Sequence, residues 1–150
     1  MKILFISSVS LISHGGSQTR DLLTKTFGLP LEASKPDPEY VFSEGIEGSK
    51  HFGVWPLNQA AEACFGTSQW PAGLPLPQLS LELEVENADA VTAAEAELRA
   101  SGHELLHATR TEPWGQTVCR LLSKEGAILG VSFAPWLHDK TLKSGLRTGR

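Results

Sequence analysis

Apolar and polar positions in the first third of the chain follow the two periods of regular secondary structure. Residues 3–12 form a mostly apolar, extended stretch, which predicts a strand. From Ser17, a residue type that caps helices, to Phe27 the apolar side chains recur at helical spacing, and Gly28 follows as a helix-ending residue. Further strands are predicted at residues 29–33, 39–45 and 50–57, the last two joined as a hairpin.

Residues 79–85 alternate leucine with glutamate, which is typical of a strand with one buried and one solvated face. We expect the leucines to face the core, and Glu82 and Glu84 to face solvent. Asn87 or Asp89 begins a helix that continues to the next glycine. Three more strands are predicted, at residues 104–108, 117–122 and 127–133.

The order of elements in the first part of the chain returns in the second part. The segment 28–31, which follows a helix, matches 102–105 at an offset of 74 residues, and 51–54 matches 128–131 at an offset of 77. Because the whole order repeats and the offsets nearly agree, we interpret the chain as two copies of one βαβββ module. The predicted fold class is therefore α+β.

We assign the first module to residues 1–57, the second to 79–136, and a flexible tail to 137–150. The connector 58–78 begins with an alanine-rich stretch that suits one or two helical turns, and continues with alternating prolines. Proline fits neither a central strand nor a helix interior. We therefore predict an exposed connector, or one that crosses to a second subunit.

Composition narrows the classes of function. The net charge of −4 argues against a nucleic-acid partner, because phosphate binding needs a basic surface. No apolar run reaches the length of a membrane span, and the apolar start breaks at Ser7 and Ser8, too early for a signal peptide. We expect a cytoplasmic protein without a membrane partner, with Cys64 and Cys119 reduced and buried.

Two motifs resemble the vicinal-oxygen-chelate family, which includes glyoxalases, bleomycin-resistance proteins and extradiol dioxygenases. Residues 28–32 read Gly-Leu-Pro-Leu-Glu after a helix, and residues 112–116 read Glu-Pro-Trp-Gly-Gln before a strand that ends near Glu125-Gly126. The resemblance spans about residues 3–135. It implies paired βαβββ modules whose mixed sheet curls into a cup, often in a homodimer.

In enzymes of that family, the resemblance implies a divalent metal held by His, Gln or Glu on the first and last strand of each module. The corresponding positions here are Ser7 or Ser8, Gly53, Ser80 and Gly130. Glycine has no side-chain donor and neutral serine is a poor ligand. We therefore predict no metal ligand, no cofactor and no catalytic residue.

The family also includes metal-free proteins that sequester antibiotics, and this is the function we expect. A concave sheet suits an aromatic or bulky small molecule, and indole rings stack on flat rings. Trp55 lies two residues beyond Gly53, on the face from which a metal ligand would project. The candidate ligand-binding residues are the anchors Trp55, Trp114 and Trp70, with Phe5 and the polar residues His51, Gln116 and Arg120.

Two alternatives stay open. A metalloenzyme such as a lyase or dioxygenase would need displaced ligands, and His51 with Glu44 or Glu104 is the nearest donor set. A metal-free enzyme would need Cys119 as a nucleophile in an electropositive setting. Strand alternation places Arg120 on the opposite face from Cys119, which favours a core cysteine.

Overall fold

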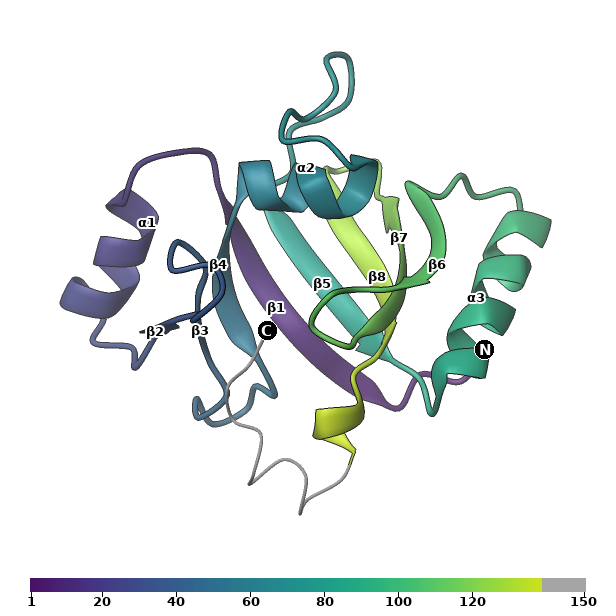
Figure 1. Ribbon diagram of the computed structural model, residues 1–150, viewed down its shortest axis with the longest axis horizontal. Coiled ribbons are helices and arrows are strands. Elements are labelled where there is room, and N and C mark those ends of the chain that lie inside the picture. The colour runs from purple at the N-terminus through teal and green to yellow at the C-terminus, as the bar shows by residue number, and fades with distance from the viewer. Residues whose placement is uncertain (139–150) are drawn as a thin grey trace.

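The computed structural model describes residues 1–138 as one curled eight-stranded sheet with helices α1 and α3 at its two ends (Figure 1). The strands are β1 (Phe5–Ser13), β2 (Glu32–Ala33), β3 (Val41–Ser43), β4 (Phe52–Pro56), β5 (Leu79–Glu84), β6 (His107–Thr111), β7 (Thr117–Leu122) and β8 (Ala127–Phe133). The helices are α1 (Gln18–Asp21), continued by the π-helix η1 (Leu22–Thr26), then α2 (Leu57–Phe65), α3 (Ala88–Ala100) and the 3₁₀ turn η2 (Pro135–Leu137). Within this part of the chain, no helix has the length and apolar character that crossing a membrane requires.

The sheet consists of two four-stranded halves that meet at β1 and β5. The strand order is β2-β3-β4-β1-β5-β8-β7-β6. In each half the first strand runs parallel to the last, β1 with β4 and β5 with β8, whereas β1 and β5 pair antiparallel. This topology confirms the α+β class and the two βαβββ modules expected from the sequence.

Polar residues of both modules meet where β1 pairs with β5. Ser10 lies opposite Ser80, and Ser8 lies opposite Glu82. Ser8, Ser10, Ser80 and Glu82 are all buried, on the face that also carries Ile12 and Trp55, which we call the inner face. The centre of the inner face is therefore lined by hydroxyls and a carboxylate.

The two module helices cover the other, outer face. Helix η1 packs on β3 and β4, and α3 packs on β7 and β8. Helix α3 begins as predicted, with the Asn87 side chain accepting a hydrogen bond of 2.9 Å from the Ala90 N–H. Ser17 makes no such cap, because its hydroxyl donates to the Asp21 carboxylate instead.

The prediction for the two faces of β5 is wrong. Glu82 and Glu84 are 2% and 0% exposed, whereas Leu79, Leu81 and Leu83 on the opposite face are only half-buried. The alternation of leucine and glutamate fixes two faces but does not say which one the rest of the chain covers. Here the covered face is the polar one.

Glu84 on β5 contacts two residues of the segment after β8, Ala134 and His138. Its Oε2 accepts a hydrogen bond of 2.6 Å from the Ala134 N–H and lies 2.7 Å from His138 Nε2. Burial raises the pKa of the Glu84 carboxyl, and the hydrogen bonds from Ala134 and His138 oppose that rise. The charged form of Glu84 is thus less favourable in the folded protein than in the unfolded chain.

Glu84→Gln should therefore change how stability depends on pH. An unfolded glutamate has a pKa of about 4.3, so a raised pKa means that folding favours the protonated form. Relative to Glu84→Gln, the wild type should be most stable below pH 4.3 and should lose stability as the pH rises through the pKa of Glu84. Urea unfolding of both proteins between pH 4 and 8 measures this. Parallel pH profiles would contradict it.

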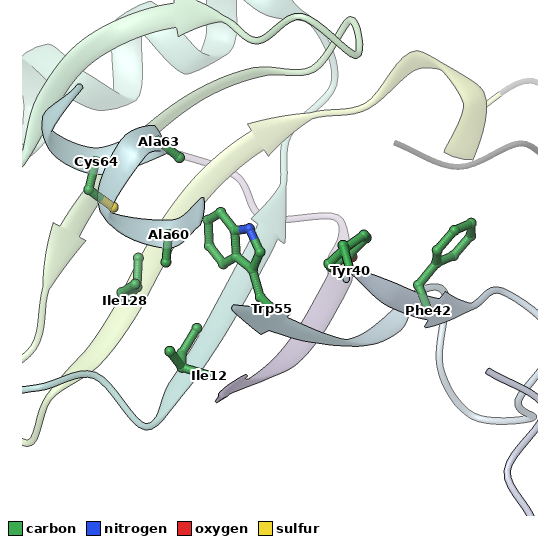
Figure 2. Packing of buried hydrophobic residues seen from close by; sticks show 8 residues of the cluster. All are labelled: Ile12, Tyr40, Phe42, Trp55, Ala60, Ala63, Cys64 and Ile128. Carbon is green, nitrogen blue, oxygen red and sulfur yellow. The ribbon is translucent and has the colours of Figure 1, made fainter. Parts of the chain in front are cut away.

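Helix α2 fills one end of the inner face (Figure 2). Ala60, Ala63 and Cys64 pack there against Ile12 and Trp55, as the main hydrophobic cluster of the inner face. The connector 58–78 was expected to be exposed or to cross to a second subunit. Helix α2 corrects that expectation for residues 58–65, because its small alanines let the helix approach the sheet closely. From residue 66 to 76 the connector is largely exposed, as predicted.

Several element boundaries differ from the sequence prediction. β6 begins three residues later than expected, because its ladder with β7 runs from His107 opposite Arg120 to Thr111 opposite Thr117. Leu137, at the start of the predicted flexible tail, is buried in η2. The rest of that predicted tail, 139–150, lies outside the described residues.

Candidate functional site

Trp55 and Trp114, two of the predicted anchors, line the same cleft. Trp55 projects from β4 on the inner face, and Trp114 lies in the turn between β6 and β7. The cleft has a volume of about 550 Å³, which is within the usual range for small-molecule sites. A narrow extension of about 30 Å³ is lined by both indoles and by Tyr40. We call this the tryptophan cleft.

The polar lining of the tryptophan cleft carries a net negative charge. Glu62 on α2 and Asp37 before β3 contribute exposed carboxylates. Arg110 and Glu112 form an ion pair, with 2.6 Å between Nε and Oε1, so their charges offset each other. The cleft therefore offers a ligand the half-buried ring of Trp114, the small exposed part of Trp55 and two acidic groups.

Arg120 is completely buried behind the cleft. Its guanidinium carbon lies 5.5 Å from the ring centre of Trp55. Its terminal nitrogens lie 3.7 Å from a Glu82 oxygen and 3.5 Å from a Glu112 oxygen, and Nη1 donates to His107 Nε2 at 3.1 Å. A buried charge needs such partners, because desolvation alone would make it very unfavourable.

Gln116 connects Trp114 to the centre of the inner face. Its amide nitrogen donates to Glu82 at 3.0 Å and to the Ser132 hydroxyl at 2.9 Å. Its amide oxygen accepts a hydrogen bond of 2.8 Å from the Trp114 indole. Gln116 is 1% exposed, so it holds Trp114 in place from within rather than offering a free group to a ligand.

The hydrogen bonds of His107 specify a neutral ring. Nδ1 donates to the Ala108 carbonyl at 2.7 Å, which leaves Nε2 as the acceptor for Arg120. Burial lowers the pKa of His107, and the nearby charges of Arg120 and Arg110 lower it further. His107 thus faces the guanidinium with a lone pair.

His51 lies in a buried chain of polar contacts. Its Nδ1 is 3.1 Å from the Glu44 carboxylate, and its Nε2 is 2.5 Å from the Tyr40 hydroxyl. The structure thus brings together the His51–Glu44 pair on which the metalloenzyme alternative depends, whereas Glu104 is exposed. Across residues 1–138, no three His, Cys, Asp or Glu side chains are arranged to hold a metal ion.

Gly53 and Gly130 stand at two positions where the family resemblance places metal-ligating side chains. Both lie against side chains that fill the space such a side chain would need. A Cβ on Gly53 would be 3.0 Å from the Tyr40 hydroxyl. A Cβ on Gly130 would be 3.3 Å from Glu82 Cγ and 3.8 Å from Arg120 Cγ. The cavity beside Ser8 and Glu82 measures only about 10 Å³, close to the minimum for one water molecule. These residues do not fit the metal that the fold family implies.

Gly53→Ala should destabilise the protein more than Gly130→Ala. The new Cβ at residue 53 would lie 2.9 Å from the Val41 carbonyl oxygen, which belongs to the backbone and cannot rotate away. At residue 130 the nearest atoms belong to side chains at 3.3 Å or more. We expect a loss of about 1–3 kcal/mol for Gly53→Ala and a smaller loss for Gly130→Ala in urea unfolding. Equal losses for the two variants would mean that the backbone beside residue 53 moves away from the new Cβ at little cost in free energy.

Trp70 and Phe5 lie away from the tryptophan cleft. Trp70 packs edge-on against Phe65, its indole donates to the Pro75 carbonyl at 3.0 Å, and it lines a separate open cleft of about 850 Å³ beside α1. Phe5 packs against His138 and beneath the ammonium of Lys50. The structure therefore places Trp55 and Trp114 at the tryptophan cleft and His51, Gln116 and Arg120 in buried polar contacts of the inner face, whereas Trp70 and Phe5 do not line this cleft.

Both cysteines are buried and free. Burial raises the pKa of Cys64 to about 11 and also raises the pKa of Cys119. Cys119 packs under α3 on the outer face, opposite Arg120, as strand alternation predicted. Neither thiol is suited to act as a nucleophile, since the thiolate is the reactive form.

Sequence reasoning missed Glu82, Glu112 and Tyr40 as parts of the site. One signal was available for Glu82. Ser8 and Ser10 are spaced two residues apart on the first strand, and Ser80 and Glu82 repeat that spacing on the fifth strand. Two polar pairs at corresponding places in the two modules indicate a polar inner face. Tyr40 lies just before its strand and carries no comparable signal.

Comparison with known proteins rests on structure alone, because no protein-family model and no curated protein matches the sequence. One similar structure is a glyoxalase/bleomycin resistance protein/dioxygenase superfamily member from Vibrio splendidus 12B01, at 12% identity and a TM-score of 0.54, covering 87% of this chain and 98% of that chain. Another is a variant methylmalonyl-CoA epimerase from Streptomyces coelicolor in complex with 2-nitronate-propionyl-CoA, at 13% identity and a TM-score of 0.57, covering 92% of this chain and 99% of that chain.

Identities this low establish the fold and no more. The likeness extends over both modules, because most of each chain is covered. It agrees with the strand order and with the motifs at residues 28–32 and 112–116. The chain therefore has the vicinal-oxygen-chelate fold.

Proposed function

We propose that this chain binds an aromatic or bulky small molecule reversibly in the tryptophan cleft, without a divalent metal ion, in the manner of an antibiotic-sequestering protein. The observation that carries the proposal is that Trp55 and Trp114 line one open cleft of about 550 Å³. Aromatic rings attract flat ligands by stacking in addition to the area they bury. The centre of the inner face is filled by the protein's own side chains, which leaves the mouth of the cup for the ligand.

The acidic lining favours a ligand that carries a positive charge. Asp37 and Glu62 are exposed at the cleft, and Arg110 is already paired with Glu112. Tryptophan faces also attract cations. Between two flat molecules of similar size, the cationic one should bind more tightly.

Titration of tryptophan fluorescence tests both the binding in the tryptophan cleft and the preference for a cationic ligand. The probes are 9-aminoacridine, which is cationic at neutral pH, and 9-anthracenecarboxylate, which is an anion of similar shape, followed by a panel of aromatic antibiotics. Trp114→Ala should weaken acridine binding by roughly 2- to 12-fold, since stacking contributes about 0.5–1.5 kcal/mol beyond buried area. Trp70→Ala is the matched control and should leave the affinity unchanged.

The outcomes separate clearly. Absence of quenching by every probe at micromolar concentration, or an equal effect of the two tryptophan substitutions, would contradict binding in this cleft. Elemental analysis of protein purified without chelator or affinity tag tests the metal-free part of the proposal. Stoichiometric zinc, nickel, manganese or iron would instead support the metalloenzyme alternative.

The protein should also form a homodimer. Leu79, Leu81 and Leu83 are only half-buried on the outer face, and Ile6 on the neighbouring strand is 54% exposed. Apolar patches of this kind favour association. Analytical ultracentrifugation at micromolar concentration measures the oligomeric state, and a single monomeric species would contradict the proposed dimer.

A further inference from the structure

We propose that the narrow extension of the tryptophan cleft is a subsite for an unsubstituted ammonium group, so that the preferred ligand is a flat aromatic molecule with a primary amine on a short arm. The inference rests on the proposed function and names the charged group that accompanies the aromatic ring. Its basis is the lining of this small space. Three aromatic rings, one carboxylate and one amide line it, those of Tyr40, Trp55, Trp114, Asp37 and Gln59.

The lining of the extension suits an ammonium group. Such a group has three N–H donors and no acceptor. The Asp37 carboxylate and the Gln59 amide oxygen can accept hydrogen bonds from it, and aromatic rings attract a cation that lies within about 6 Å of their centres. Because the space is so small, a nitrogen inside it contacts the rings that line it. A hydroxyl of the same size would gain less, because it carries no charge.

The volume of the extension limits the size of the group that enters it. A cavity needs about 10–15 Å³ to hold one water molecule. The extension measures about 30 Å³, so it has room for about two water-sized groups. A methylene and an unsubstituted ammonium fit this space. A trimethylammonium group has the same charge but is larger by three methyl groups, so it would have to stay in the wider part of the cleft.

The aromatic walls are held in place by the protein itself. The Tyr40 hydroxyl lies 2.5 Å from His51 Nε2, and the Trp114 indole donates to the Gln116 amide oxygen at 2.8 Å. Trp55 packs in the hydrophobic cluster beneath α2. Walls that are already ordered lose little conformational entropy when a ligand binds. They also keep the extension narrow, so that the size of the ligand's charged group affects its affinity.

The charges around the extension favour a cation. Arg120 faces one of the indoles of the cleft, 5.5 Å from its ring centre. This guanidinium belongs to a cluster of two positive and two negative side chains, Arg110, Arg120, Glu82 and Glu112, so the cluster carries no net charge. Asp37 is exposed at the extension and adds a negative charge to this neutral background.

Calorimetric titration with three naphthalene probes tests the inference. The probes are 1-naphthylmethylamine, which is an ammonium ion at neutral pH, its N,N,N-trimethyl derivative, and 1-naphthalenemethanol. The wild type should bind the primary amine roughly 2- to 30-fold more tightly than the alcohol, the range for a cation beside aromatic rings. The trimethylated cation should bind more weakly than the primary amine, because it is too large for the extension.

Asp37→Asn and Glu62→Gln form a matched pair, because each neutralises an exposed carboxylate of the cleft but only Asp37 lines the extension. Asp37→Asn should lower the preference for the primary over the trimethylated cation by about 1.5- to 5-fold, since only the primary ammonium can donate to the carboxylate. Glu62→Gln should weaken both cations alike. Trp114→Ala removes one wall of the extension and should abolish the discrimination by size.

The inference and the proposed function can fail separately. If the wild type binds all three probes with equal affinity, the inference is overturned and binding of aromatic molecules in the cleft still stands. Tighter binding of the trimethylated cation than of the primary amine would also overturn the inference, as would an equal change of the preference in the two carboxylate variants. If none of the three probes binds, both the inference and the proposed function are contradicted.

Discussion

Glu82→Ala is expected to destabilise the protein by about 3–5 kcal/mol, the range for breaking a buried ion pair by removing one partner. Glu82 is 2% exposed; its Oε1 accepts a hydrogen bond from Gln116 at 3.0 Å, and its Oε2 lies 3.7 Å from Arg120. Alanine would leave the guanidinium with one carboxylate in place of two and would leave the Gln116 amide without this acceptor. The free energy of unfolding in urea measures the loss.

Two companion variants identify the cause of the expected loss. Glu82→Gln keeps an acceptor for Gln116 but removes the charge. Its free energy of unfolding should therefore lie between that of the wild type and that of Glu82→Ala. Glu86→Ala removes an exposed carboxylate nearby in the chain and should change the stability by less than about 0.5 kcal/mol. If Glu82→Ala and Glu86→Ala behave alike, the buried network around Arg120 contributes nothing to stability.

Trp55→Ala is expected to cost about 3–5 kcal/mol, as is usual for deleting a large buried aromatic side chain. Trp55 is 7% exposed and belongs to the hydrophobic cluster that helix α2 covers. Figure 2 shows its indole directed toward Ala60 and Ala63 of that helix. The substitution would open a cavity under α2 and would remove the aromatic face above Arg120.

Trp70→Ala is the matched control for Trp55→Ala. Trp70 is half-buried at the edge of the same cluster, so its removal should cost clearly less in urea unfolding. Equal losses would mean that α2 does not depend on packing against Trp55. If Trp55→Ala loses stability but keeps its acridine affinity, Trp55 packs beneath α2 and does not contribute to ligand binding.

Much of the fold could be predicted from periodicity and turn residues. The ranges predicted for β7 and β8 coincide with the observed strands, because a glycine-containing turn separates two apolar runs. The strand predicted at residues 29–33 is reduced to Glu32–Ala33. Pro30 has no N–H for a sheet ladder, and the side chains of Leu29 and Leu31 pack beneath η1 instead.

The candidate site was predictable only in part. Trp55 was placed on the inner face by its spacing from Gly53, and Arg120 was placed opposite Cys119 by strand alternation. Their surroundings were not predictable, because the partners of Arg120 come from β5, from β6 and from the turn after β6. Local patterns carry no information about such distant pairings.

The sequence by itself determined the order of the elements, the repeat of the βαβββ module and the absence of metal-ligand side chains at the four positions where the family resemblance places them. Only the tertiary structure decided that the glutamate face of β5 is buried and that α2 fills one end of the inner face. The physical reason is that a buried carboxylate is acceptable only with partners, and a partner of Glu82 such as Gln116 lies 34 residues away along the chain. Burial of charge is therefore a property of the assembled sheet and not of any single strand.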